Sequence, residues 1–310
     1  MTAARTVALT ALLIATSIGC ARGSGSDEAA APTPTPTEPR PPEPELPDDR
    51  PITVHVSPGY EASTPAPLLV LLHGFGASGE IQSAYLGLEE PVDANGMLYV
   101  YPDGTENRIG RRFWNATDAC CAGPVSDEVD DSAYLAAVIA KVRSQYNVDA
   151  RRIYVMGHSN GGFMSYRMAC DHADVIAAVA SIEGATFADP DACAPPEPVA
   201  ALQVHGTKDG TIGYEGGKIT GTAYPSATET VEMWAAYNGC SLTPDDPAPP
   251  SRDIVTGLPP ATVTAYTTDC EPGGAAELWT QPGGNHIPIW SPTFATQVVE
   301  WLLDHPKPAA

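Results

Sequence analysis

The chain has 310 residues and a formal net charge of −22 at pH 7. So acidic a protein would be repelled by phosphates, which argues against nucleic acid as a partner and suits a soluble protein outside the cell. We expect the folded part to cover residues 51–310, long enough for one α/β domain with a single core.

Residues 1–20 are typical of a signal peptide. Arg5 precedes an apolar run over residues 7–18 that is too short to span a bilayer as a stable helix. The end of this stretch resembles a bacterial lipobox, in which Cys20 becomes the lipidated first residue of an envelope-anchored lipoprotein. Cleavage after Ala21 is the alternative, and both routes predict export. Membrane attachment is expected only through a lipidated Cys20.

Residues 21–50 are rich in proline. Nine of the twenty residues from Pro32 to Pro51 are proline, mixed with Thr, Glu and Asp. Such a composition cannot bury a core and favours an extended, semi-rigid chain. We therefore expect residues 21–50 to be a disordered linker that holds the domain away from a surface.

The domain begins with two predicted strands. Residues 52–56 alternate in polarity as an edge strand does, and residues 68–72 form a continuous apolar run, typical of a strand covered on both faces. His73 and a glycine-rich turn follow. This turn would aim the backbone N–H of Phe75 at an oxyanion, with His73 as a structural brace. A plain glycine turn is the alternative.

The next predicted strand, residues 96–101, is followed by a polar loop that carries Trp114. A helix is expected near residues 133–146, because its apolar side chains recur with helical spacing. Asp130 and Asp131 precede it. A metal or acid–base role is conceivable for this pair, but an aspartate at the helix N-cap is the simpler interpretation.

Residues 153–164 read as a buried strand, a sharp turn and the start of a helix. The turn carries Gly-x-Ser-x-Gly, the nucleophile elbow pattern, with Ser159 at its centre. Gly157 and Gly161 fit because a tight turn presses helix against strand. The backbone N–H of Asn160, at the start of the helix, would face an oxyanion formed on the acyl carbon.

The rest of the chain continues the alternation of strands and helices. Expected strands are residues 175–180, 199–206, 261–267 and 276–280, and expected helices are residues 227–237 and 293–303. Strands that alternate with helices imply an α/β fold with a mostly parallel sheet, whose functional residues gather at the carboxyl ends of the strands.

Ser159, Asp209 and His286 each follow a predicted strand, in the order Ser–Asp–His. Ser159 would attack an ester carbonyl, His286 would take its proton and pass it to the leaving alcohol, and Asp209 would orient the imidazole. Among rival acids, Asp103 comes too early in the chain and Glu215 lies deeper in the loop. We see no clustered metal spacing and no phosphate loop, so no metal or cofactor is predicted.

Several motifs act as a set: Leu72-His73-Gly74, Trp114-Asn115 with Cys120-Cys121 and Asp130-Asp131, Gly-His-Ser-Asn-Gly-Gly, His-Gly-Thr-x-Asp and Gly-Gly-x-His. Over roughly residues 51–304 the chain resembles the secreted polyhydroxybutyrate depolymerase-like esterases, relatives of feruloyl and acetylxylan esterases. The resemblance implies an α/β-hydrolase fold, carboxylic-ester hydrolysis, no cofactor and the triad above. Many members carry Trp where this chain has Pro288, so the resemblance leaves the identity of the ester substrate undecided.

Only residues 184–197 separate two central strands, and their prolines do not suit a long helix. We therefore expect no large lid and an open cleft for a polymeric or oligomeric ester. Trp114, Tyr214 and Trp290 could stack on an aryl or sugar group, although packing roles are equally compatible with their loops. A serine peptidase and an inactive, surface-tethered binding module are the competing functions.

Six cysteines remain once Cys20 is lipidated or removed with the signal peptide. An even number in an oxidising compartment predicts three disulfides. Cys240–Cys270 is the favoured pair, since it would join the end of a helix to the stretch after a nearby strand. The other four can pair in three ways, including a bridge between adjacent residues: Cys120, Cys121, Cys170 and Cys193.

Overall fold

The computed structural model describes residues 45–121 and 129–309. The expected signal peptide, Cys20 and the linker as far as residue 44 lie outside these residues, so the predictions made for them stay predictions. No helix in the described ranges is both long and apolar enough to cross a membrane.

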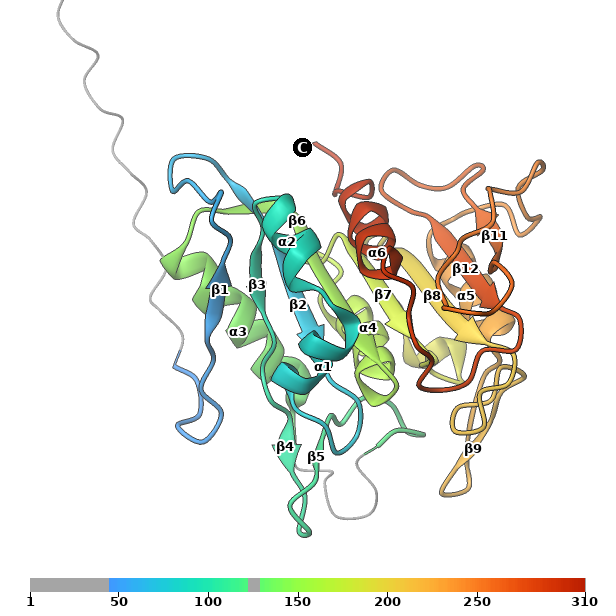
Figure 1. Ribbon diagram of the computed structural model, residues 1–310, viewed down its shortest axis with the longest axis horizontal. Helices are drawn as coiled ribbons and strands as arrows, with labels where there is room; N and C mark the ends of the chain where they lie inside the picture. The colour runs from blue at the N-terminus through green and yellow to red at the C-terminus, as the bar shows by residue number, and fades with distance from the viewer. Residues whose placement is uncertain (1–44, 122–128, 310) are drawn as a thin grey trace, which may run out of the picture. The chain divides into compact units, whose positions relative to one another are not determined.

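Eight strands form the central sheet, in the order β1-β3-β2-β6-β7-β8-β12-β11 (Figure 1). The six inner strands pair in parallel, and β1 and β11 close the two edges in antiparallel fashion. The predicted mostly parallel sheet is confirmed. The strands span Val54–Val56 (β1), Ala66–Leu72 (β2), Leu98–Val100 (β3), Val148–His158 (β6), Ala178–Ile182 (β7), Ala200–Gly206 (β8), Thr262–Tyr266 (β11) and Ala276–Gln281 (β12).

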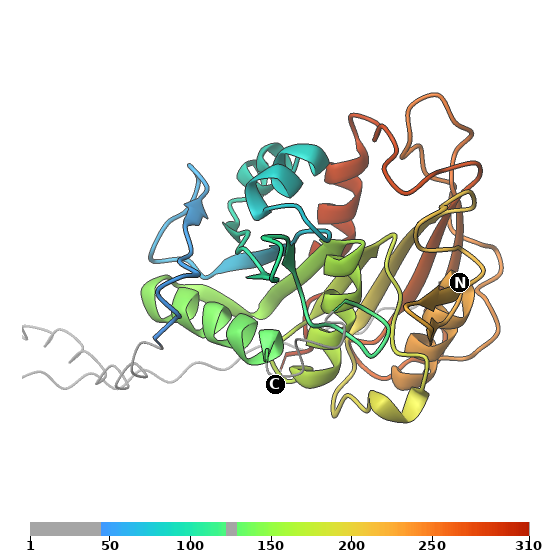
Figure 2. The ribbon, with the colours of Figure 1, turned by 90° about the horizontal axis from the view of Figure 1, so that it is seen from below.

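Helices cover both faces of the sheet (Figure 2). One face carries α1 (Gly79–Leu86), α2 (Glu89–Ala94) and α6 (Phe294–Leu303), and the other carries α3 (Asp131–Gln145), α4 (Asn160–Asp171) and α5 (Ala227–Tyr237). This arrangement makes the sheet the buried middle layer of the domain, as its continuous apolar strands predict.

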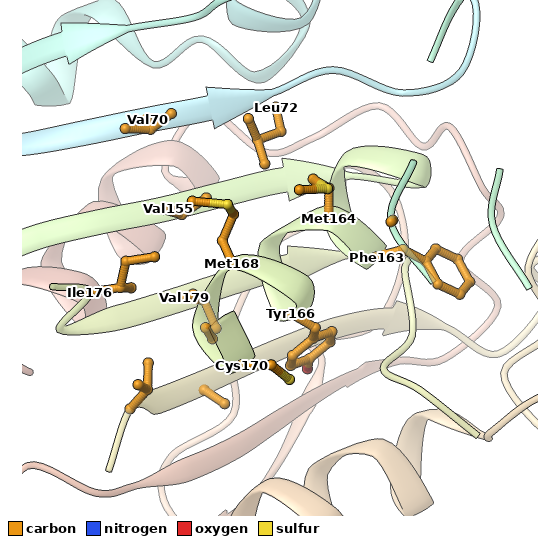
Figure 3. Close-up of a cluster of buried hydrophobic side chains, with 14 of the residues drawn as sticks. Val70, Leu72, Val155, Phe163, Met164, Tyr166, Met168, Cys170, Ile176 and Val179 are labelled. Atoms are coloured by element: carbon orange, nitrogen blue, oxygen red, sulfur yellow. The ribbon is translucent and has the colours of Figure 1, made fainter. Parts of the chain in front are cut away.

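Side chains of β2 divide between two cores because successive residues of a strand point to opposite faces. Leu68 and Val70 belong to the core beneath α3, α4 and α5, whereas Leu69 and Leu71 belong to the core beneath α1, α2 and α6. Figure 3 shows the first core, where strand side chains such as Val70 lie opposite the methionines of α4.

The start of α3 confirms one of the two interpretations of the aspartate pair. Asp130 is the N-cap, and its side chain accepts a hydrogen bond from the N–H of Ala133 at 2.9 Å. Asp131 is buried instead and forms an ion pair of 2.8 Å with Arg50. The pair therefore begins a helix and anchors the preceding chain.

That anchor corrects the expected end of the linker. The guanidinium of Arg50 lies 3.6 Å from the centre of the Tyr134 ring, and Leu46 packs against the core. Residues 45–50 thus contact the domain, so its boundary lies before residue 51. The linker composition gave no sign of this because the partners of Arg50 follow more than fifty residues later in the chain.

Sequence patterns did not indicate the short elements α1, α2 and two hairpins. The hairpins are β4 (Thr105–Glu106) with β5 (Arg112–Phe113), and β9 (Gly217–Ile219) with β10 (Thr222–Tyr224). In Figure 1 both project beyond the lower end of the sheet. As predicted, the segment between β7 and β8 holds no long helix, only a 3₁₀ turn at Pro190–Ala192.

All six cysteines after Cys20 form disulfides. The predicted Cys240–Cys270 bridge is confirmed. The other pairings, which the sequence left open, are a bridge between α4 and the 3₁₀ turn and a bridge between neighbours in the loop before α3: Cys170–Cys193 and Cys120–Cys121.

Candidate active site

Ser159 lies in the tight turn between β6 and α4, with a positive φ of 56°. Residues other than glycine rarely adopt this backbone conformation, and it occurs at functional sites where the surrounding structure imposes it. A Cβ added to Gly157 would lie 2.2 Å from the carbonyl oxygen of Gly161, and one added to Gly161 would lie 2.1 Å from that of Leu72. Both glycines are therefore required for the turn to pack against the sheet.

His286 lies between the other two predicted triad residues. Asp209 follows β8, and His286 follows β12, the neighbouring strand. The Ser159 hydroxyl is 2.9 Å from Nε2 of His286, and Nδ1 of His286 donates to Oδ2 of Asp209 at 2.6 Å. The three side chains thus form a continuous hydrogen-bonded chain, the arrangement that lets an imidazole accept a proton from a serine.

The surroundings of Asp209 favour its charged form. Burial alone would raise its pKa, but the neighbouring side chains of His205, His286 and Glu183 outweigh burial and hold the pKa well below its usual value. Its Oδ1 also accepts from two backbone N–H groups, those of Thr211 at 2.7 Å and Ile212 at 2.9 Å. Asp209 is therefore a fixed negative charge aimed at the imidazole.

His158, beside the nucleophile, supports the loop that carries His286. Its Nε2 donates to the carbonyl oxygen of His286 at 2.9 Å, and the two rings are 5.0 Å apart. Burial and the charge of protonated His286 lower the pKa of His158 to about 4. His158 therefore stays neutral at pH 7 and places no positive charge against the imidazolium that His286 would become.

The loop after β2 lies against the elbow, where the second oxyanion donor is expected. A Cβ added to Gly74 would lie 3.5 Å from Cβ of Ser159, and the Gly74 N–H donates to buried Gln82 of α1 at 3.0 Å. Phe75 follows directly. Asn160 is held by its side chain, which accepts from the N–H of Trp114 at 2.7 Å. The oxyanion roles of Phe75 and Asn160 stay predictions.

His73 has the structural role expected of it. It is fully buried, and its Nε2 accepts a hydrogen bond from the N–H of Gly104 at 2.9 Å. Its Nδ1 donates to the carbonyl oxygen of Gly74 at 2.8 Å. His73 thus ties the loop after β2 to the loop after β3.

The three aromatic side chains proposed to bind substrate have different surroundings. Trp114 is 0% exposed and its indole N–H donates to the carbonyl oxygen of His73 at 3.0 Å, so the expectation that it contacts substrate is wrong. Tyr214 is half-buried and bonds Thr280 at 2.8 Å. Half-buried Trp290 stacks on Phe294. For Tyr214 and Trp290 a substrate role stays a prediction.

The sequence interpretation missed two buried groups beside Asp209. Glu183 follows β7 directly and is 1% exposed, and His205 lies in β8. The Nε2 of His205 is 3.5 Å from Glu183 and 3.6 Å from Asp209. One signal could have pointed to Glu183, because it occupies the same place after its strand as Ser159 does after β6.

Glu183, His205 and Asp209 are close enough to surround a cation. The hydrogen bonds of His205 do not fit that role. Its Nδ1 accepts from the side-chain amide of Gln203 at 2.9 Å, and its Nε2 donates to the carbonyl oxygen of Ile212 at 2.9 Å. Neither ring nitrogen has a lone pair left for a metal, so the cluster is a hydrogen-bond network.

This sheet, with the serine in a strand–turn–helix elbow, defines an α/β-hydrolase fold. A family model described as phospholipase/carboxylesterase matches residues 59–241, more than half of the chain. The chain therefore belongs to this family.

Curated relatives agree with the resemblance seen in the sequence. Feruloyl esterase B of Piromyces equi is 28% identical over 246 residues, which cover 76% of this chain and 42% of that protein. The putative esterase NocK of Nocardia uniformis subsp. tsuyamanensis is 28% identical over 254 residues, 76% of this chain and 70% of that one. The chain thus spans less than half the length of the first relative.

Solved structures share the fold. An acetyl xylan esterase from Aspergillus awamori superposes with a TM-score of 0.56 and 16% identity, covering 81% of this chain and 93% of that one. A thermostable esterase gives a TM-score of 0.54 and 17% identity, covering 83% and 60%. These structures show the fold, whereas the curated relatives, which include a bifunctional acetylxylan esterase/xylanase of Neocallimastix patriciarum, confirm the predicted relationship to feruloyl and acetylxylan esterases.

Proposed function

We propose that the chain is an exported serine esterase that hydrolyses carboxylic esters through an acyl-enzyme. The observation that carries the proposal is the hydrogen-bonded chain from Ser159 through His286 to Asp209. Membership of the carboxylesterase family and the names of the relatives support ester hydrolysis. No cofactor takes part in the proposed reaction.

In the first half of the reaction, Oγ of Ser159 attacks the carbonyl carbon while Nε2 of His286 takes its proton. The negative charge on the carbonyl oxygen is stabilised by the N–H groups of Phe75 and Asn160. The tetrahedral intermediate collapses, the alcohol leaves with the proton from His286, and the acyl group stays on Ser159. Asp209 stabilises the imidazolium throughout.

In the second half, a water molecule replaces the alcohol. His286 takes one proton from the water as its oxygen attacks the acyl carbon, and then returns that proton to Oγ of Ser159. The products are a carboxylic acid and the free enzyme. The sequence of steps requires a base that can accept a proton from Ser159 and a fixed negative charge, that of Asp209, to stabilise the imidazolium.

The proposed substrates are polymers or oligomers with short acyl or hydroxyacyl groups, either a polyhydroxybutyrate-type polyester or plant-wall feruloyl and acetyl esters. Two relatives named as feruloyl and acetylxylan esterases support the second class. The absence of a helical lid between β7 and β8 in the described chain supports an open site. Three exposed apolar side chains adjoin the site in sequence: Phe75, Ile287 and Ile289.

A labelling experiment tests the mechanism. A fluorophosphonate probe should label the wild-type protein stoichiometrically at Ser159 and should not label Ser159→Ala, which should also lose turnover. Turnover by Ser159→Ala near the wild-type rate would refute the serine mechanism. Labelled protein without turnover on any ester would instead favour a binding module.

A substrate panel tests the choice of ester. Initial rates would be compared on short-chain and long-chain nitrophenyl esters, methyl ferulate, acetylated xylan and polyhydroxybutyrate film. We expect short esters to be preferred and no rate increase above the solubility limit. Fastest cleavage of long-chain triglyceride emulsions, with a jump above that limit, would contradict the open site.

Export and lipidation of Cys20 belong to the same proposal. Three disulfides suit an oxidising compartment, and this supports export. In cells that express the full chain, the wild-type protein should fractionate with membranes and Cys20→Ala should become soluble. Equal partitioning of the two proteins would favour ordinary cleavage after Ala21.

A further inference from the structure

Two carboxyl groups are buried together beside the proposed imidazole base. Glu183 and Asp209 both have almost fully buried side chains, and one carboxyl oxygen of each lies within 4.8 Å of the other. Two carboxylates this close and shielded from water repel each other, so one of the two holds a proton. The pair therefore carries one negative charge.

The neighbours of each carboxyl decide which one is protonated. Asp209 accepts from two backbone N–H groups and from His286, and its pKa is lowered. Glu183 accepts from one backbone N–H, that of Gly206. Burial raises the pKa of Glu183, and the contact with Asp209 raises it further. The proton belongs to Glu183.

The backbone holds Glu183 in this position. Its N–H donates to the carbonyl oxygen of Val204 at 2.9 Å, which extends the pairing of β7 with β8 by one residue. Its φ of 54° is unusual for a residue with a side chain. A glutamate held in this conformation is the kind of outlier from which a functional role is inferred.

The other charged or titratable groups around Glu183 and Asp209 do not donate a hydrogen bond between the two carboxyl groups. His205 uses its Nε2–H for the carbonyl oxygen of Ile212 and lies 3.5 Å from Glu183. The hydroxyl of Tyr85 donates to the carbonyl oxygen of Pro288 at 2.9 Å and so is not available to Glu183. His286 lies beyond Asp209. The hydroxyl of the Glu183 carboxyl group is left to pair with Asp209.

We propose that Glu183 is a positioning residue, whose carboxyl hydroxyl donates a hydrogen bond to Asp209 and thereby holds Asp209 in line with Nδ1 of His286. The inference rests on the proposed function and names a further residue for the same reaction. No proton leaves Glu183 during turnover. Its role is to fix the orientation of Asp209 without adding a second charge to the site.

Two substitutions separate this role from general structural support. Glu183→Gln keeps an N–H donor for Asp209 and an acceptor for Gly206, so kcat should stay within about threefold of the wild-type value. Glu183→Leu keeps the bulk but removes the hydrogen bonds, and kcat should fall about 10²-fold with KM little changed, as expected for a misplaced catalytic group. Glu277→Gln is the matched control, because Glu277 is a buried glutamate that contacts Trp279 and Trp301 instead.

The pH profile of kcat/KM gives a readout that does not depend on Glu183→Leu folding. If Glu183 is neutral, its replacement by a neutral amide changes no charge, so the acid limb of the Glu183→Gln profile should lie at the same pH as that of the wild type. An ionised Glu183 would stabilise protonated His286, and its removal would move the acid limb down by about one pH unit. Such a shift would overturn the inference, as would a Glu183→Gln enzyme as slow as Glu183→Leu.

A failure of the positioning role can be distinguished from a failure of the proposed serine mechanism. Ser159→Ala is assayed in parallel with the same nitrophenyl ester. Turnover by Ser159→Ala would remove the serine mechanism whatever the Glu183 variants do. An inactive Ser159→Ala together with wild-type kcat in a folded Glu183→Leu would refute only the positioning role.

Discussion

Replacement of Asp209 by asparagine should disable the proposed base by changing its tautomer. Oδ1 of Asp209 accepts from the N–H groups of Thr211 and Ile212, so the amide oxygen of Asn must occupy that position. The NH₂ group then faces Nδ1 of His286, 2.6 Å away in the wild type. Nδ1 has to accept this bond, its proton moves to Nε2, and Nε2 can no longer take the proton of Ser159.

The size of the effect follows from the loss of general-base catalysis. The same substitution in the serine-protease triad costs about 10⁴-fold in kcat. A factor of about 10⁴ corresponds to about 5 kcal/mol of transition-state stabilisation. The assay is kcat for a short-chain nitrophenyl ester at pH 7, with circular dichroism and thermal unfolding to show that Asp209→Asn is folded.

Asp103→Asn is the matched control. Asp103 also lies in a loop after a strand and also accepts a backbone hydrogen bond, from Gly79 at 2.8 Å, but it pairs with Arg112 and not with an imidazole. Its kcat should stay within about tenfold of the wild-type value. If Asp209→Asn also stayed within that range, the tautomer argument and the choice of Asp209 as the acid would both be refuted.

Three further predictions concern stability. Trp114→Ala should lower the free energy of unfolding by about 3–5 kcal/mol in urea, because Trp114 is fully buried; an unchanged midpoint would contradict its place in the core. Cys240→Ser with Cys270→Ser should cost about 3–4 kcal/mol, since the bridge closes a loop with a sequence separation of 30, and thiol titration of unreduced wild type should find almost none. The pKa of His158 is about 4 in the folded protein and about 6.5 in the unfolded chain, so below pH 6.5 unfolding takes up a proton. The free energy of unfolding should therefore fall by about 3 kcal/mol as the pH drops from 6.5 to 4. In His158→Gln this contribution to the pH dependence of stability should be absent.

Local signals explain why so much of the fold could be predicted. The buried strands are continuous apolar runs, and the elbow glycines are required by contacts of 2.2 Å and 2.1 Å that a Cβ would make at Gly157 and Gly161. Asp130 begins its helix as an N-cap should. The patterns themselves are local and can be recognised in the sequence, even though the contact that excludes a Cβ at Gly161 is made with Leu72 of β2.

The sequence predictions that were wrong or incomplete concern residues whose roles depend on contacts with distant parts of the chain. Trp114 lies in a loop, as expected, but its burial depends on the carbonyl oxygen of His73, forty-one positions earlier. Arg50 lies in a proline-rich stretch typical of a linker, and only its ion pair with Asp131 shows that it belongs to the domain. Glu183 shares with Ser159 only its position after a strand, and its partners, Gly206 of β8 and Asp209 beyond it, follow more than twenty residues later in the chain. Contacts between segments distant in the chain decide these roles, and composition and periodicity do not report such contacts.

The sheet itself accounts for where the proposed chemistry lies. His158, at the end of β6, pairs with Ile182 at the end of β7, and Ile182 pairs with Val204 in β8. The residues just past these ends, Ser159 and Glu183, are therefore brought to one edge by strand pairing before any loop contributes. The loops after β8 and β12 then add Asp209 and His286, and the exposed side chains of Ile287 and Ile289 follow His286 directly. The proposed triad can be predicted from sequence because local motifs mark its residues at the ends of strands. No local motif in the loops identifies the ester, so the substrate has to be measured.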